Sequence, residues 1–147
     1  MSGGATWPNG SHGLCGDPAS AAAPRSLEAG GAAYTGAVGG QYSQGAVLTA
    51  VVAVTAFHQG RFGLRVCRVP GAPDAAAEPA ALTEACLDAN VLVQAGVAGA
   101  QAPGQRWYYL GTVPPAVAPA SYTSYWQLPP GLTCDGTTAH CVLQWYW

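Results

Sequence analysis

The sequence contains no lysine and little charge of either sign: 8% of its 147 residues are charged, and the formal net charge is −2. Nucleic acids and anionic membranes bind proteins through clustered positive charge, so we expect neither as a partner. Threonines interrupt the longest apolar stretch, which falls short of the roughly 18 apolar residues that a membrane-spanning helix needs. The first residues also lack the basic and apolar regions of a secretory signal peptide.

Several sequence signatures of enzymes are missing as well. There is no G-x-S-x-G nucleophile motif, no P-loop, no G-x-G-x-x-G after a predicted strand and no C-x-x-C pair for structural zinc. The seven acidic residues lie mostly in predicted loops, with no sign of the opposed carboxylate pair that a glycosidase uses. Hydrolysis is therefore not the expected chemistry.

Glycine and proline are abundant, with 20 and 12 residues, and they divide the chain into short segments. Frequent glycines and prolines disfavour long helices and favour short strands joined by turns. The β-branched stretch 45–56 fits a strand buried on both faces, or two strand segments in line, whereas 62–69 alternates as a half-buried strand does. Further strands are predicted at 90–97, 107–113, 121–128 and 141–147, and one or two helical turns at 80–87.

Six or seven short strands with turns between them predict an all-β protein of the sandwich type. We expect a single domain, in which 1–33 is irregular and 34–147 forms the β-sandwich core. In the last strand, Val142, Gln144 and Tyr146 should share one face, and the residues between them the other.

Five cysteines indicate an oxidising compartment, because Cys67 with Cys86 and Cys134 with Cys141 are placed where disulfides could close loops. Cys15 is then left over. Five buried, reduced thiols are the alternative, since connectivity does not follow from one sequence.

His58 is the most informative single residue. It follows the most apolar predicted strand, in a His-Gln-Gly turn, where rigid neighbours hold a side chain that can still reach the surface. A lone histidine near a core is usually a hydrogen-bonded structural residue, so its position alone does not establish a metal site. His140, in the loop between Cys134 and Cys141, is expected to be exposed to solvent rather than to bind a metal.

Three motifs, in order along the chain, carry a family resemblance. Residues 55–67 read TAFHQGRFGLRVC, which resembles the T-A-x-H-x-G-x-F-x-x-R-x-C segment of lytic polysaccharide monooxygenases of the animal and algal branch. LPPGLTC at 128–134 and CVLQW at 141–145 resemble that branch's L-P-x-G-L-T-C and C-V-L-Q-W ending. GLCGDP at 13–18, followed by PR, EAGG and YTG, resembles a third segment. The same sequences are commonly grouped as a chitin-binding type 4 domain.

The resemblance implies an immunoglobulin- or fibronectin-like β-sandwich with disulfide-stapled loops and a flat face that carries one copper ion. In the family, copper is held by the amino group and imidazole of an N-terminal histidine and by the imidazole that matches His58. Neutral nitrogen ligands suit both copper oxidation states and leave positions open for oxygen or peroxide. Ala56 matches the small residue beside the open copper position, although a strand alanine chosen for packing is an equally good interpretation.

The end of the chain supplies the other site residues that the resemblance implies. The family's axial aromatic residue corresponds to Tyr146 or Trp147, and Gln144 is expected to hydrogen-bond a copper-bound oxygen species. This branch usually has tyrosine at the position of Trp147, so the residue is changed or the register is shifted. Packing of this aromatic strand in the core is the alternative. Cys15 is expected to be a free thiol, because its family partners lie in an upstream segment.

The N-terminal histidine of the copper site has no counterpart in the sequence, so we expect the domain to be N-terminally incomplete. Cleavage before His12 would create a histidine N-terminus, but the neighbouring motif places His12 well inside the family domain. The expected function is copper-dependent oxidative cleavage of insoluble chitin or cellulose by a secreted monomer. A non-catalytic polysaccharide-binding module and an inactive fragment of the same fold are the alternatives.

Some aromatic side chains could stack on sugar rings, although most fit the sandwich core better. They are Trp107, Tyr108, Tyr109, Tyr122, Tyr125 and Trp126.

Overall fold

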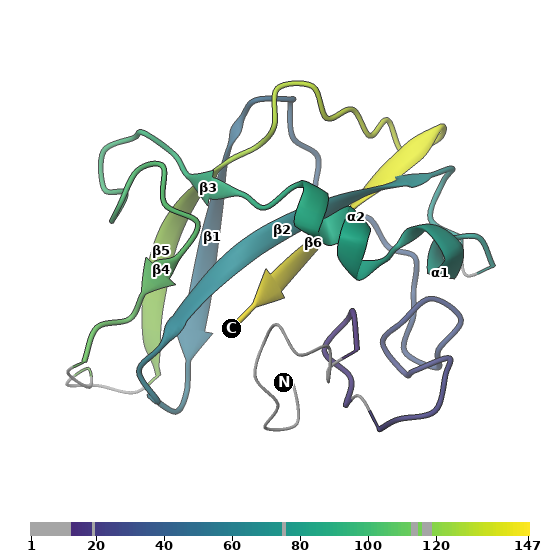
Figure 1. The fold of residues 1–147 in the computed structure, drawn as a ribbon, viewed down its shortest axis with the longest axis horizontal. Coiled ribbons are helices and arrows are strands. Elements are labelled where there is room, and N and C mark those ends of the chain that lie inside the picture. Colours follow the sequence, from purple (N-terminus) through teal and green to yellow (C-terminus); the bar gives the residue numbers. More distant parts are fainter. Residues whose placement is uncertain (1–12, 19, 75, 113–114, 116–118) are drawn as a thin grey trace. The chain divides into compact units, whose positions relative to one another are not determined.

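The computed structural model of the chain describes residues 13–18, 20–74, 76–112, 115 and 119–147. This part of the chain contains six strands and two short helices, which are labelled in Figure 1. In chain order they are β1 (Val47–Val54), β2 (Arg61–Pro70), α1 (Glu78–Ala81), α2 (Glu84–Ala89), β3 (Val93–Gln94), β4 (Tyr108–Tyr109), β5 (Ala120–Gln127) and β6 (Ala139–Tyr146). Each predicted strand overlaps one of these strands, and the predicted helical turns overlap α1 and α2. Neither helix has the length and apolar character needed to cross a membrane.

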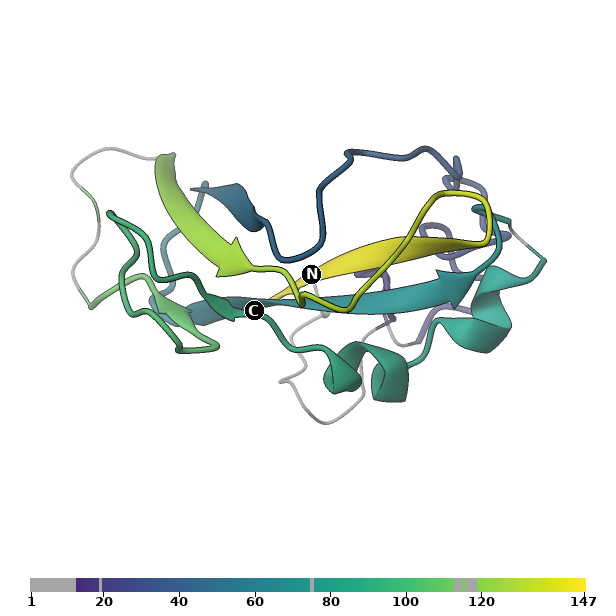
Figure 2. The same ribbon diagram turned by 90° about the horizontal axis from the view of Figure 1, so that it is seen from above.

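The strands form two three-stranded sheets, with the orders β1-β5-β3 and β4-β2-β6. β1 and β5 pair antiparallel along their whole length, from Val47 opposite Gln127 to Val54 opposite Ala120, and they lie side by side (Figure 1, Figure 2). β3 pairs with the other edge of β5. The predicted all-β class and sandwich type are therefore confirmed.

The described contacts divide the chain into two compact units, which we treat separately. The disulfide unit comprises Met1–Gln41, Val66–Asn90 and Thr133–Gln144, and it contains all five cysteines. The aromatic unit comprises Tyr42–Arg65, Val91–Leu132 and Trp145–Trp147. The predicted boundary between an irregular segment and the core, at residues 33 and 34, stays a prediction.

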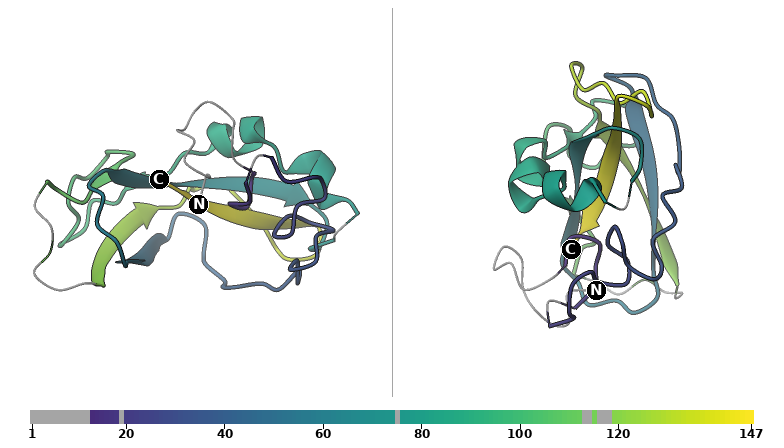
Figure 3. Two further views of the ribbon diagram at one scale, coloured as in Figure 1. Left: turned by 90° about the horizontal axis from the view of Figure 1, so that it is seen from below. Right: turned by 90° about the vertical axis from the view of Figure 1, so that its right-hand side faces the viewer.

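The core of the disulfide unit forms where α1 and α2 pack along the second half of β2 (Figure 3). α2 begins at Thr83, whose hydroxyl accepts a hydrogen bond of 3.1 Å from the Cys86 amide, as an N-cap does. Cys86 is bonded to Cys67 and Cys134 to Cys141, so both predicted disulfides are present. Cys15 is a free thiol, as expected.

The core of the aromatic unit is built around Trp126 and Phe62, both fully buried, whose ring centroids are 6.2 Å apart. Phe62 also stacks on Tyr108 at 5.0 Å. The Trp126 indole N–H donates a hydrogen bond of 2.9 Å to the Ser124 hydroxyl, which in turn donates to the carbonyl of Ala50 on β1. The buried indole is therefore satisfied within the β1-β5-β3 sheet.

Two sequence-based expectations about burial are wrong, and they are wrong in opposite directions. The stretch 45–56 does not form a strand buried on both faces: Val51 is 64% exposed, while Leu48 is buried. Exposed residues alternate with more buried ones along β1, so one face of the strand is open to solvent. β2 is not half-buried, because Arg65 and Cys67 on its second face are also fully buried. On the second face of β2, Cys67 and Val69 pack against Leu82 and Leu87 at the two helices, which explains why this face is covered.

The expectation that His140 is exposed is also wrong. It lies at the start of β6 rather than in a loop, and 7% of it is exposed. Its two ring nitrogens lie 2.9 Å from the Gly71 carbonyl and 3.1 Å from the Glu78 carboxylate. These buried partners explain why a histidine is tolerated at this position.

Candidate functional site at the His58 turn

His58 lies on an exposed turn between β1 and β2, within the aromatic unit. The two residues that follow, Gln59 and Gly60, have φ angles of +60° and +92°. Glycine adopts such a conformation readily, which explains why the His-Gln-Gly sequence can turn sharply here. The Gln59 side chain reaches the carbonyl of Thr112 at 3.5 Å. The turn thus presents the His58 imidazole to solvent, with Ala56 also exposed beside it in the sequence.

Trp147 packs against this turn. A Cβ atom built at Gly60 would lie 3.0 Å from the indole Nε1 of Trp147, so the ring rests directly on the glycine backbone. Trp147 is 42% exposed, and its ring makes an edge contact with Trp145 at 5.9 Å. Of the two axial candidates from the sequence, Trp147 is therefore the one that lies at the His58 turn.

Tyr146 lies on the opposite, buried face of β6. Its ring is 4.8 Å from the Arg65 guanidinium and 5.2 Å from the ring of Trp107. A Cβ atom at Gly63 would meet its hydroxyl at 2.8 Å, so Tyr146 fills the space that this glycine leaves. These contacts are those of a core residue.

Gln144 belongs to the disulfide unit, whereas His58, Ala56, Tyr146 and Trp147 belong to the aromatic unit. It is buried, and its side-chain amide donates a hydrogen bond of 2.8 Å to the carbonyl of Leu14. This bond gives Gln144 a structural role. A role next to copper stays a prediction.

The sequence analysis named Trp107 and Tyr109 as possible sugar-stacking residues but missed the arginine next to them, Arg61. The Arg61 guanidinium lies 4.2 Å from the centroid of the Trp107 ring, and it approaches the Tyr109 hydroxyl at 3.4 Å. Arg61 pairs with Tyr109 across β2 and β4, and 49% of Tyr109 is exposed. Trp126, which shared the same sequence-based description as Tyr109, is fully buried. An arginine directly after the His-Gln-Gly turn was the available signal.

The described residues do not by themselves form a complete copper site. Within 13–147, apart from the residues left out above, no three His, Cys, Asp or Glu side chains gather as metal ligands. His58 supplies one imidazole, and a T-shaped copper site needs three nitrogen ligands. His12, the other candidate from the sequence, lies outside the described residues. We therefore derive no copper-dependent step from this geometry.

No family model and no curated protein matches the chain. A solved structure, the lytic polysaccharide monooxygenase AA15 from Thermobia domestica in the Cu(I) state, matches with a TM-score of 0.70 and 28% sequence identity. The match covers 90% of this chain and 58% of that structure, so this chain spans a little over half of its length. The resemblance predicted from the three motifs is confirmed, because the chain shares its fold and 28% of its aligned sequence with this AA15 lytic polysaccharide monooxygenase.

Proposed function

We propose that this chain is the polysaccharide-facing β-sandwich of a secreted monooxygenase-type protein, which takes part in copper-dependent oxidative cleavage of insoluble chitin or cellulose. The observation that carries the proposal is the match to the Thermobia domestica enzyme over 90% of this chain, combined with the exposed His58 in the motif that resembles the family's copper-binding segment. His58 would supply one copper ligand. The remaining ligands would come from outside the described residues.

The surface at the His58 turn suits a flat, uncharged substrate. Trp147 and Tyr109 are both more than 40% exposed, and Arg61 provides hydrogen-bond donors near Tyr109. Aromatic rings with a polar edge bind surfaces that are part apolar and part hydroxylated, as crystalline polysaccharides are. Low overall charge is compatible with such a partner.

The two disulfides support the proposal that the protein works outside the cell, since such bonds persist in oxidising compartments. A second candidate function is supported by the ligand set. Because the described residues provide a single imidazole at this turn, a module that binds polysaccharide without copper is the alternative.

Copper titration with electron paramagnetic resonance tests the metal part of the proposal. If His58 is a copper ligand and ligands outside the described residues complete the site, the wild-type chain gives a stoichiometric type 2 Cu(II) signal, which His58→Ala loses. Trp145→Phe serves as the control. It keeps an aromatic ring at the position two residues before Trp147, so the copper signal should be unchanged. No copper binding by the wild type would contradict the enzyme assignment.

Sedimentation with insoluble chitin and cellulose tests the polysaccharide part. Trp147→Ala and Tyr109→Ala should each reduce the bound fraction, whereas Tyr42→Ala, at an exposed tyrosine outside the group described above, should not. If the chain binds polysaccharide but not copper, the non-catalytic binding module is favoured. If it binds neither polysaccharide nor copper, the inactive-fragment interpretation remains.

A further inference from the structure

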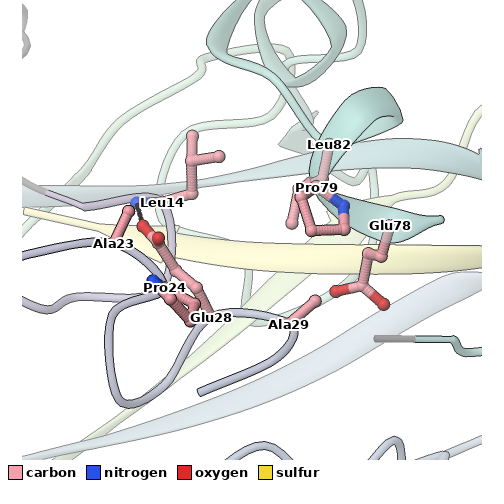
Figure 4. A pocket seen from close by; sticks show the side chains of 8 residues that line it. All are labelled: Leu14, Ala23, Pro24, Glu28, Ala29, Glu78, Pro79 and Leu82. Atoms are coloured by element: carbon pink, nitrogen blue, oxygen red, sulfur yellow. Dashed lines mark hydrogen bonds between the residues drawn. The ribbon is translucent and has the colours of Figure 1, made fainter. Parts of the chain in front are cut away.

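A small cavity of about 200 Å³ lies within the disulfide unit (Figure 4). Most of its lining is apolar, and the two carboxylates among the lining side chains are those of Glu28 and Glu78. Glu28 is held by the Arg25 guanidinium at 3.0 Å and by the Leu14 amide at 3.1 Å. Glu78, only 5% exposed, is held differently.

Three segments of the disulfide unit meet at the Glu78 carboxylate. The Tyr34 hydroxyl donates a hydrogen bond of 2.8 Å to Oε2 of Glu78. Nε2 of His140, on β6, lies 3.1 Å from the same oxygen, and Nδ1 of His140 lies 2.9 Å from the Gly71 carbonyl. The network therefore connects the segment before β1, helix α1, β6 and the turn after β2.

The donors and acceptors of this network do not balance unless an additional proton is present. A carbonyl oxygen can only accept, so Nδ1 of His140 must carry a proton and donate it to Gly71. In a neutral imidazole Nε2 is then a bare acceptor, and an ionised Glu78 carboxylate is also an acceptor. Two acceptors 3.1 Å apart would repel each other in a buried site. One proton between them removes the conflict.

We propose that His140 and Glu78 share one proton in the folded protein, and that this proton is a pH-sensitive latch that holds α1 and Tyr34 to β6. The proton can be written as an imidazolium beside a carboxylate, or as a neutral imidazole beside a carboxylic acid; the number of protons in the pair is the same. The proposal does not depend on the proposed function, because none of its residues belongs to the His58 turn.

The charged groups in this part of the unit include three further carboxylates and one guanidinium. Glu28 and Asp17 act electrostatically on Cys15 together with Glu78, and Asp74 acts with Glu78 on Tyr34. Arg25, the cation on this side, is paired with Glu28. Desolvation, followed by the hydrogen bond to Glu78, raises the pKa of Tyr34 to about 12, so its hydroxyl remains a donor at any pH used below.

Loss of the shared proton would open one end of the unit. Nε2 and the Glu78 carboxylate would then face each other as unpaired acceptors, and α1 and the Tyr34 segment would separate from β6. The Cys67–Cys86 disulfide would still hold α2 to β2. Opening would therefore be local.

The pH dependence of unfolding in urea tests the latch. An unfolded histidine loses its proton above a pH of about 6.5. Above that value the folded protein would bind one more proton than the unfolded chain, so its stability should fall as pH rises. The unfolding constant should increase by up to about tenfold per pH unit until the latch proton is released.

Glu78→Gln provides the matched variant. The amide N–H of glutamine can donate to a neutral His140 Nε2, so no shared proton is needed and the pH dependence above 6.5 should flatten. Tyr34→Phe removes one hydrogen bond to Glu78 but not the proton, so it should lower stability and keep the wild-type slope. The exposed His58 contributes equally to all three curves. A Glu78→Gln slope equal to that of the wild type would overturn the latch.

NMR of the wild type gives an answer even if Glu78→Gln does not fold. At pH 7.5, the ¹⁵N shifts of His140 and the carboxyl ¹³C shift of Glu78 should together report one proton in the pair, either on Nε2 or on the carboxyl group. A bare Nε2 together with an ionised Glu78 in the folded protein would disprove the proposal.

Discussion

The indole of Trp147 rests on the backbone of Gly60, where an added Cβ atom would lie 3.0 Å from Nε1. Gly60 also has a φ of +92°, which disfavours any side chain. We expect Gly60→Ala to lower the free energy of unfolding by about 2–3 kcal/mol, from backbone strain and displacement of the indole combined.

Gly104→Ala is the matched control for this change. Gly104 has a φ of +80° but no atom within 4 Å of the added Cβ, so it should lose about 1–2 kcal/mol from strain alone. Urea unfolding followed by tryptophan fluorescence measures both. Equal losses in the two variants would mean that the Trp147 contact contributes nothing.

Ser124→Ala should destabilise the aromatic unit by about 1–3 kcal/mol, because it leaves the fully buried Trp126 indole N–H without its acceptor. Trp126→Phe removes the donor as well as ring volume. In a double-mutant cycle, Ser124→Ala should therefore lower the free energy of unfolding by less in the Trp126→Phe background than in the wild type. Additive losses, measured by thermal unfolding, would show that the hydrogen bond is not the cause.

The Cys15 thiol should be nearly inert at neutral pH. Desolvation, followed by the carboxylates of Glu28, Glu78 and Asp17, raises its pKa from 9.0 to about 11. Because the thiolate is the reactive form, alkylation by iodoacetamide at pH 8 should be roughly a hundredfold slower in the folded protein than in urea. The folded rate should rise as pH increases toward 11, and the raised pKa means that stability declines between pH 9 and 11. Rapid alkylation of the folded chain at pH 8 would contradict this.

The two disulfides should differ in their contribution to stability. Cys67 and Cys86 are separated by 19 residues and Cys134 and Cys141 by 7. Loop entropy predicts losses of about 3 kcal/mol for Cys67→Ala with Cys86→Ala, and about 2 kcal/mol for Cys134→Ala with Cys141→Ala. Calorimetry of the two double variants gives the comparison, and the opposite order would show that packing outweighs loop closure.

The positions of the strands could be predicted from the sequence because glycine and proline mark their ends, and the sandwich followed from their number. Burial of each face could not. Whether a face of a strand such as β1 is covered depends on packing between distant segments, and Val51 has no local signal of exposure. Arg65 resembled a surface residue by alternation, but it is fully buried, with its guanidinium 4.8 Å from the Tyr146 ring.

The candidate site was only partly accessible to sequence reasoning. The His-Gln-Gly turn identified His58 correctly as an exposed residue, because its glycine conformation is local. The choice between Tyr146 and Trp147 depended on which face of β6 is buried, and a strand pattern of alternating large residues does not reveal that. The same applies to His140, whose partners Gly71 and Glu78 are more than sixty residues away.

All five cysteines, and so both disulfides, lie in one of the two compact units, while the other relies on ring packing and hydrogen bonds. Only one of the two units therefore depends on an oxidising environment for its covalent cross-links. In a reducing compartment the cross-linked part would lose its covalent support first, whereas the part that contains His58 would keep every interaction described for it.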